Sequence, residues 1–187
     1  MEIKRTQIDG LLIIKPDVFE DERGYFFESY NKNKFKEIGL EINFVQDNIS
    51  KSSFGTIRGL HYQIGEYAQG KLCSVLSGKV LDVAVDLRFG SPTYGKYFSI
   101  ELSSENKFQF WIPAGFAHGF SVLSKEAIFH YKCSNFYNKA SERCIIYNDS
   151  KLRVDWKVTN PIVSEKDLLG KNFNEIDKDF FIKLKED

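Results

Sequence analysis

Three histidines are the side chains best suited to acid–base chemistry near neutral pH, because an imidazole can both take and give a proton there. His61 lies in the string GTIRGLHYQ, and His118 lies in FWIPAGFAHGF, directly after a predicted tight turn. His130, in AIFHYK, is expected to face away from Tyr131 because side chains alternate along a strand. His61 and His118 are therefore the candidates for chemistry.

Metal binding requires more ligands than these strings supply. The segment from Pro113 to His118 resembles half of the metal-binding signature of the cupin superfamily, whose other half is a His-x-His pair followed by a glutamate. Here His61, Tyr62 and Gln63 take that place, so the second imidazole is missing. Two imidazoles without an obvious carboxylate are too few for a closed site. We expect no metal, and a metal-dependent cupin dioxygenase is the alternative that metal analysis would test.

Motifs for covalent catalysis and for nucleotide cofactors are absent from the sequence. It contains no Gly-x-Ser-x-Gly elbow and no Gly-x-Gly-x-x-Gly that opens a helix, so we expect no cofactor. General acid–base chemistry is left. Lys71, at the head of an apolar strand, can hold negative charge on an oxygen, and Tyr131 can deliver a proton from a second direction.

The elements that must position these side chains are short strands. Runs rich in β-branched and aromatic residues recur between turn residues, at Leu11–Ile14, Tyr25–Tyr30, Leu72–Leu76, Val80–Leu87, Tyr97–Leu102, Phe108–Ile112, Phe120–Leu123, Ile128–Cys133 and Cys144–Tyr147. This spacing predicts an all-β sandwich or barrel. Runs such as KLCSVL and KVLDVAVDL have apolar residues at both odd and even positions, so side chains on both faces of these strands are expected to be buried. This pattern favours a two-sheet, double-stranded jelly roll.

Helix is predicted in only two places. The string NKNKFKEI can form two turns, with Asn31 as the N-cap and Gly39 as the stop. A second short helix is predicted to begin at Ser164, because SEKD has the pattern of a capping box. No repeat or linker divides the chain, so residues 1–187 are expected to form one domain, with a tail at 171–187 that the pattern does not place.

Composition argues against several classes of protein. Twenty-six basic and twenty-six acidic residues cancel, whereas a nucleic-acid binder needs clustered excess Lys and Arg. No apolar run is long enough to span a bilayer or to act as a signal peptide, and Cys73 and Cys133 are expected to be buried free thiols. We therefore expect a cytoplasmic protein that binds neither membrane nor nucleic acid. Aromatic residues make up 15% of the chain, and sticky sheet edges favour a homodimer.

Six strings, in order, resemble the dTDP-4-dehydrorhamnose 3,5-epimerase family. They are FEDERGYFFESYN, FVQDNISKSSFGTIRGLHYQ, QGKLCSVLSGKVLDVAVDLRFGSPTYGKY, FWIPAGFAHGF, HYKCSNFY and NPIVSEKDL, and the resemblance runs from about Asp17 to Leu169. It implies a dimeric jelly roll of cupin type without a metal or redox cofactor. The implied reaction inverts C3 and C5 of dTDP-4-keto-6-deoxyglucose, in the synthesis of dTDP-L-rhamnose. Both carbons flank the C4 ketone, so removing either proton gives an enolate.

The resemblance also implies catalytic roles. His61 matches the base, Asp167 the carboxylate that pairs with it, and Tyr131 the acid on the far face of the sugar. Lys71 matches the group that stabilises the enolate oxygen, with His118 beside it. Without the resemblance, Asp167 would be read as a helix cap, Tyr131 as an ordinary strand aromatic and Lys71 as a solvated charge.

A further set of residues is implied to contact the nucleotide, some of them from the partner subunit. Guanidinium groups suit phosphate oxygens, and aromatic rings can stack on thymine or belong to the core. The set comprises Arg23 and Arg58 near the sugar and diphosphate, Phe19, Phe26 and Tyr137 near the base, and the polar residues Glu28, Gln46, Asn48 and Glu142.

Strand alternation raises a difficulty for two of these residues. A regular strand through 56–63 places Arg58 and His61 on opposite faces. If both reach one substrate, Gly59 must mark a bulge; otherwise Arg58 serves the partner's site. We predict an irregularity at Gly59.

Other functions fit parts of the sequence. An epimerase of C3 or C5 alone would use the same His, Lys and Tyr, and a cupin-type 3,4-ketoisomerase fits less well because Lys71, Tyr131 and Asp167 together match the epimerase pattern. A jelly roll that only binds sugar is the alternative from a different class. Replacement of His61 should leave the task of such a protein intact.

Overall fold

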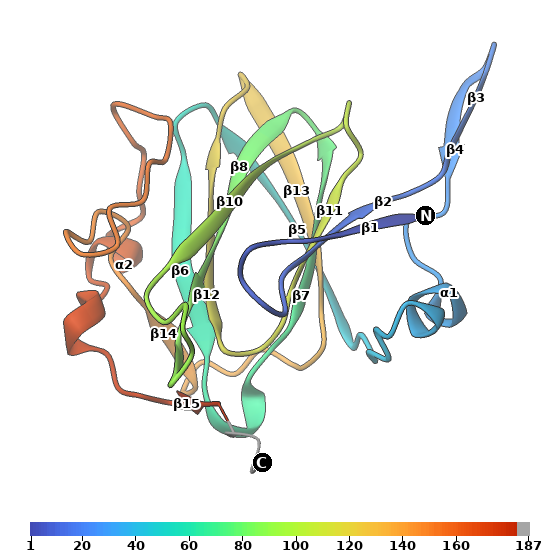
Figure 1. The fold of residues 1–187 in the computed structure, drawn as a ribbon. Helices are drawn as coiled ribbons and strands as arrows, with labels where there is room; N and C mark the ends of the chain where they lie inside the picture. Colours follow the sequence, from blue (N-terminus) through green and yellow to red (C-terminus); the bar gives the residue numbers. More distant parts are fainter. Residues whose placement is uncertain (183–187) are drawn as a thin grey trace.

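Two antiparallel sheets packed face to face form the body of the protein in the computed structural model, which describes residues 1–182 (Figure 1). In spatial order, the six-stranded sheet contains β1 (Glu2–Arg5), β2 (Leu12–Lys15), β11 (Gln109–Ile112), β7 (Lys71–Ser77), β13 (Glu126–Cys133) and β5 (Gln46–Ser53). The five-stranded sheet contains β10 (Tyr97–Ser103), β8 (Lys79–Asp86), β12 (Phe116–Val122), β6 (Ile57–Gln63) and β14 (Glu142–Cys144). The predicted all-β, two-sheet sandwich is confirmed.

The remaining elements are small. A hairpin of β3 (Val18–Asp21) and β4 (Gly24–Phe27) extends away from the sandwich, and β9 (Arg88–Phe89) pairs in parallel with β15 (Phe180–Phe181) (Figure 1). The helices are α1 (Lys32–Glu37) and α2 (Glu165–Leu168), with 3-10 turns at Gly65–Tyr67 and Phe173–Glu175. Among residues 1–182, no helix is long and apolar enough to cross a bilayer.

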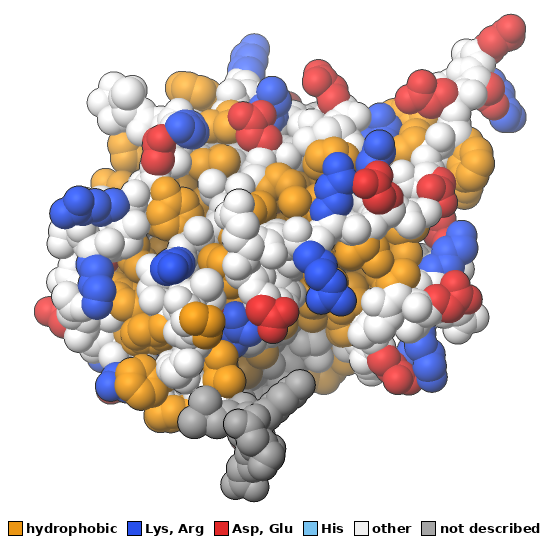
Figure 2. Space-filling view, viewed as in Figure 1, with side chains coloured by type: hydrophobic (Ala, Val, Ile, Leu, Met, Phe, Trp, Pro, Cys, Tyr) orange, Lys and Arg blue, Asp and Glu red, His pale blue; other side chains and the backbone are white. Residues whose placement is uncertain are grey.

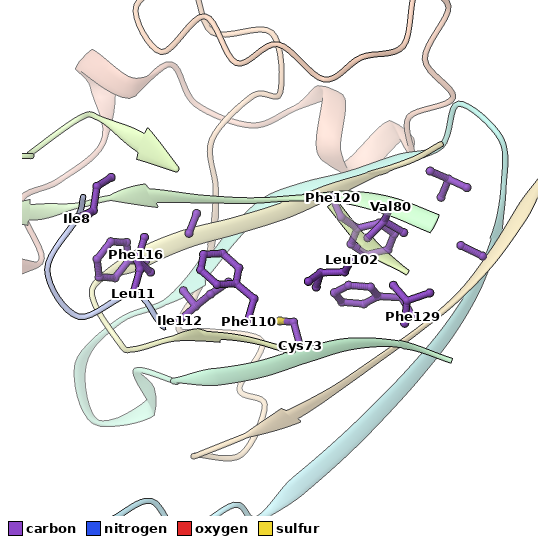
Figure 3. Packing of buried hydrophobic residues seen from close by; sticks show 14 residues of the cluster. Ile8, Leu11, Cys73, Val80, Leu102, Phe110, Ile112, Phe116, Phe120 and Phe129 are labelled. Atoms are coloured by element: carbon purple, nitrogen blue, oxygen red, sulfur yellow. The ribbon is translucent and has the colours of Figure 1, made fainter. Parts of the chain in front are cut away.

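The core lies where the two sheets face each other. Large apolar side chains of both sheets are almost fully buried there, and their removal from water is the main force that holds the sheets together. Figure 3 shows Phe110, Cys73 and Phe129 of the six-stranded sheet against Phe120, Leu102 and Val80 of the five-stranded sheet.

Strand β8 shows why some strands have apolar residues at both odd and even positions. Val80 and Ala84 belong to the cluster between the sheets, whereas Val83 belongs to a second cluster on the other face. There the segment that follows β14 covers the five-stranded sheet with side chains such as Ile145 and Trp156. The coverage on both faces that the sequence indicated is confirmed for this strand.

Both predicted helices form. In α1 the side chain of Asn31 accepts hydrogen bonds from the amides of Asn33 and Lys34, and Gly39 follows the helix with φ of +83°. In α2 Ser164 accepts the amide of Asp167. The capping box is only half formed, however, because the carboxylate of Asp167 does not turn back to the cap but binds elsewhere.

Several strand boundaries differ from the prediction. The strand predicted to begin at Phe120 begins earlier, because β12 starts at Phe116 and so includes His118. The run predicted from Cys144 is mostly wrong, since β14 ends at that residue. Strand β5 was not predicted, because its sequence QDNISKSS is polar. Of the unplaced tail, residues 171–182 contain the second 3-10 turn and β15, and residues 183–187 lie outside the described part of the chain.

Candidate active site

A cavity of about 610 Å³ is lined by both sheets and by the segment 162–167, which contains the start of α2. All four predicted catalytic residues and two predicted substrate contacts line it: His61, Lys71, Tyr131, Asp167, Arg58 and His118. A second cavity of about 240 Å³ shares His61, Lys71 and Tyr131 with the first. It adds four predicted nucleotide contacts, Gln46, Asn48, Tyr137 and Glu142.

His61 and Asp167 form a hydrogen-bonded pair across 106 residues of sequence, with 2.8 Å between Nε2 and Oδ1. The second oxygen, Oδ2, accepts the amide of Gly59 at 3.2 Å. Burial alone would raise the pKa of Asp167, but the hydrogen bonds from His61 and Gly59 lower it below the usual range. An ionised Asp167 favours the tautomer of His61 whose Nε2 carries a proton to donate, and in that tautomer the lone pair lies on Nδ1.

A bulge at Gly59 brings Arg58 and His61 to one cavity. In the pairing of β12 with β6, His118 lies opposite His61 but Phe120 lies opposite Arg58, so β6 carries one extra residue. Gly59 has φ of +128°, and a Cβ there would lie 2.5 Å from the Cα of Gly119. Only glycine fits this position. The predicted irregularity is confirmed, and Arg58 lines the cavity of its own chain.

Lys71 and Tyr131 enter the cavity from neighbouring strands of the six-stranded sheet. The Nζ of Lys71 lies 5.8 Å from the centre of the Tyr131 ring. Burial, with smaller contributions from the thiols of Cys133 and Cys73, raises the pKa of Tyr131 to about 12, so the phenol keeps its proton near neutral pH. Lys71 is half-buried rather than solvated.

His118, which lines the cavity, is hydrogen-bonded to Asp82, which does not line it. Asp82 was not predicted as a site residue from the sequence. The two side chains are buried, and Nε2 lies 2.6 Å from Oδ1. Burial lowers the pKa of His118 although Asp82 opposes this, so the ring is neutral. The signal that could have found Asp82 is an acidic residue inside the apolar run KVLDVAVD, because a buried carboxylate requires a partner.

Glu142 joins the two cavities through a polar network. It accepts a hydrogen bond from the Tyr137 hydroxyl at 2.9 Å and pairs with Lys166 at 2.6 Å. Lys166 lines the larger cavity and was missed in the sequence, where nothing distinguishes it from other surface lysines. Tyr137 is half exposed, so it is not a core residue, and its amide donates to Gln46.

Four predicted nucleotide contacts do not reach this cavity within one chain. Phe19 and Phe26 lie on the β3–β4 hairpin with 66% and 69% of their surface exposed, so they are not core residues either. Arg23 at the hairpin tip pairs with Asp21, and Glu28 pairs with Lys34 of α1. Figure 2 shows the hairpin standing clear of the body, with charged side chains at its tip. Within one chain these four residues therefore lie apart from the cavity, which leaves the partner subunit as the place for their predicted contacts.

His130 lies outside both cavities. Its Nδ1 is 3.2 Å from the Ser74 hydroxyl, and its Nε2 is 3.7 Å from Asp47. The expected orientation away from the site is confirmed. Cys73 and Cys133 are buried free thiols, also as expected.

Comparison with known proteins gives a consistent result. A family model described as dTDP-4-dehydrorhamnose 3,5-epimerase matches residues 5–175. A relative of that name from Shigella flexneri is 53% identical over 183 residues, covering 97% of this chain and 100% of its own. The crystal structure of the same enzyme from Elizabethkingia anophelis is 57% identical, with a TM-score of 0.89 over 93% of this chain and 97% of that one.

A second crystal structure contains a sugar nucleotide. It is dTDP-6-deoxy-D-glucose-3,5-epimerase from Legionella pneumophila in complex with dTDP-4-keto-L-rhamnose. It is 49% identical to this chain, with a TM-score of 0.94 over 98% of this chain and 99% of that one. The cupin-like sandwich of these enzymes is therefore also the fold of this chain.

Proposed function

Because this chain belongs to the dTDP-4-dehydrorhamnose 3,5-epimerase family, we propose that it inverts C3 and C5 of dTDP-4-keto-6-deoxy-D-glucose to give dTDP-4-keto-L-rhamnose. The reaction is a step of dTDP-L-rhamnose synthesis. The observation that carries the proposal is the His61–Asp167 pair, which lies in one cavity with Lys71 and Tyr131. These groups supply a base, a cation and an acid, as proton removal and return beside a ketone requires.

His61 is the base. Its Nδ1 carries the lone pair, and it takes the proton from C3 or C5 while Asp167 stabilises the imidazolium that forms. A general base contributes only about 10²–10⁴-fold to a rate, so the enolate must be stabilised as well. The ammonium group of Lys71 holds the negative charge on O4, and neutral His118 lies beside it.

Tyr131 returns the proton. It belongs to β13 of the six-stranded sheet, whereas His61 belongs to β6 of the five-stranded sheet. A sugar between the sheets is met by the base on one face and by the phenol on the other. Protonation opposite to the face that lost its proton is what inverts a carbon centre, so this arrangement supports epimerisation rather than simple exchange.

The remaining polar residues bind the nucleotide. Arg58 and Lys166 supply positive charge for the diphosphate, and a guanidinium can bind two phosphate oxygens at once. Tyr137, Gln46, Asn48 and Glu142 surround the adjoining cavity, which leads away from the catalytic residues. We place the thymidine there, with the Tyr137 ring as a stacking surface.

We infer that two copies complete each other's sites. The hairpin residues Phe19, Arg23 and Phe26 and the nearby Glu28 do not line the catalytic cavity of their own chain, and the hairpin extends away from the sandwich (Figure 1). A second copy related by twofold symmetry receives the hairpin at its own cavity, and gives its hairpin in return. The three free cysteines support a reducing, cytoplasmic compartment.

The reaction is tested by proton NMR of dTDP-4-keto-6-deoxy-D-glucose in D₂O, with a reductase to trap the product. We expect deuterium at both C3 and C5 and inversion of both. His61→Asn should abolish this, whereas His130→Asn, a histidine outside the cavities, should not. Inversion at one carbon alone would indicate a mono-epimerase. No exchange at either carbon would overturn the catalytic assignment and favour a jelly roll that only binds sugar.

Shared sites are tested by mixing inactive variants. His61→Ala and Arg23→Ala are each expected to be defective, but a hybrid of the two contains one intact site and one doubly altered site. Random pairing makes half of the dimers hybrids, so the mixture should recover about a quarter of wild-type activity. No recovery after subunit exchange, checked by mass spectrometry, would contradict the exchange of hairpins.

A further inference from the structure

Cys144 lies beside the proposed base, and the mechanism does not use it. Strands β14 and β6 are paired so that Cys144 is directly opposite His61, which places the two side chains on the same face of the sheet. One donor atom each of His61, Cys144 and Asp167 lies within 4.8 Å of the others. Within residues 1–182, the thiol itself makes a single weak hydrogen bond, at 3.5 Å, to the carbonyl oxygen of Ile145.

These three side chains are a donor set for a borderline-soft metal ion. An imidazole nitrogen, a thiolate sulfur and a carboxylate oxygen suit Zn²⁺ or Co²⁺, whereas Mg²⁺ and Ca²⁺ prefer oxygen alone. Bonds of about 2.0–2.3 Å at tetrahedral angles separate ligand atoms by roughly 3.3–3.7 Å. His61 and Asp167, now 2.8 Å apart, would need to separate by less than about 1 Å to admit the ion.

The local charge also favours a cation. Burial, with smaller contributions from the neighbouring carboxylates of Asp167 and Glu142, raises the pKa of Cys144 to about 12. The thiol is therefore protonated when no metal is bound. The same two carboxylates that disfavour a thiolate attract a dication, which can displace the thiol proton.

We propose that His61, Cys144 and Asp167 form an inhibitory zinc site. Zn²⁺ binds the Nε2 of His61, the Sγ of Cys144 and a carboxylate oxygen of Asp167, and the cavity side offers water as a fourth ligand. The thiol proton leaves to solvent, and the imidazole proton moves from Nε2 to Nδ1. The lone pair that would take the substrate proton is then occupied, so the base is blocked.

A second group with the same donor types provides the internal comparison. Cys73, Asp82 and His118 also lie within 4.8 Å of one another. All three are buried, and Asp82 holds the Nε2 of His118 at 2.6 Å. His118 lines the cavity as well, but its partners Cys73 and Asp82 do not. At the proposed site both His61 and Asp167 line the cavity and Cys144 is half-buried, so this site is the more open of the two to a zinc ion.

Metal binding is measured on the metal-free full chain by equilibrium dialysis with Zn²⁺ and by absorption with Co²⁺ as the probe. We expect one ion per chain and a thiolate-to-cobalt charge-transfer band. Cys144→Ala should lose the band and bind zinc at least about tenfold more weakly, while Cys73→Ala should keep both. No thiolate band in the wild type, or an equal loss in Cys73→Ala, would overturn the site.

Inhibition of the enzyme by zinc rests on the proposed function and is measured in a separate experiment. Zn²⁺ should suppress proton exchange from the substrate in the wild type, and a chelator should restore it. Cys144→Ala should be active without metal and resistant to zinc. Equal inhibition of both proteins would overturn the inhibitory role of Cys144. A thiolate band in a wild-type protein that exchanges no protons would instead leave the zinc site standing and overturn the epimerase function.

Discussion

Asp82 accepts a hydrogen bond of 2.6 Å from the Nε2 of His118, and both side chains are buried. The other oxygen of Asp82, Oδ2, is buried without a hydrogen-bond partner within residues 1–182. The protein thus keeps a costly polar group inside its core, and the group serves to fix the ring of His118 beside Lys71.

Asp82→Ala should therefore destabilise the protein by about 1–3 kcal/mol, since it leaves the buried Nε2–H of neutral His118 without its hydrogen-bond partner. Urea unfolding monitored by tryptophan fluorescence measures this change. Asp21→Ala breaks a fully exposed pair with Arg23 and is the control, for which no measurable change is expected. Equal stability of the two variants would contradict a structural role for Asp82.

Asp167→Asn should lower kcat by roughly 10²–10⁴-fold with little change in KM. The amide can donate a hydrogen bond to Nε2 of His61 and so stabilise the tautomer whose Nδ1 carries the proton. Steady-state kinetics on the substrate would show this. Ser164→Ala, which removes the cap of α2 but leaves the carboxylate of Asp167 in place, should lower kcat far less, and a similar loss in this control would mean that Asp167 acts through the helix.

Tyr131→Phe should separate proton removal from inversion. His61 can still remove a proton and return deuterium to the same face, so exchange in D₂O should continue while inverted product falls by about 10²–10⁴-fold. The pH dependence of kcat in the wild type tests the same role of Tyr131. Because the pKa of Tyr131 is raised from 10.0 to about 12, its ionisation should not reduce kcat until the pH rises above 10. Equal loss of exchange and inversion in Tyr131→Phe would contradict the role of the acid.

How far the sequence predicts this site depends on the range of each interaction. Local patterns correctly indicated the cap at Asn31 and the two-sided burial of β8, because each follows from residues close together in the chain. The correct prediction of a bulge at Gly59 combines strand alternation with the roles that family resemblance gives to Arg58 and His61. The pair of His61 with Asp167 spans 106 residues, and local sequence alone favoured a cap. Family resemblance supplied that link, and the structure shows the contact.

Two parts of the site depend on contacts between residues far apart in the chain. The apolar run around Asp82 marks it as a buried carboxylate that requires a partner, but the run does not identify that partner, His118, which lies 36 residues away. The placement of Phe19 and Arg23 is the second case. Their types suit a nucleotide site, but the direction in which a hairpin leaves a sandwich depends on long-range packing.

Gly59→Ala should be among the most damaging single-methyl changes in the protein. The new Cβ would lie 2.5 Å from the Cα of Gly119 and 2.8 Å from the carbonyl oxygen of His118, both backbone atoms of the paired strand. Gly24 offers a matched control, since its φ of +125° is almost the same as the +128° of Gly59, yet nothing lies within 4 Å of its Cβ position. Both variants bear the conformational cost of a side chain at positive φ, which is about 1–2 kcal/mol. Gly59→Ala should lose about 1–3 kcal/mol more than Gly24→Ala in urea unfolding, because the strands must move apart. That movement would also turn His61 away from Asp167, so kcat should fall in the fraction that stays folded. If the two variants unfold at the same urea concentration, the close approach of Gly59 to Gly119 does not constrain the bulge.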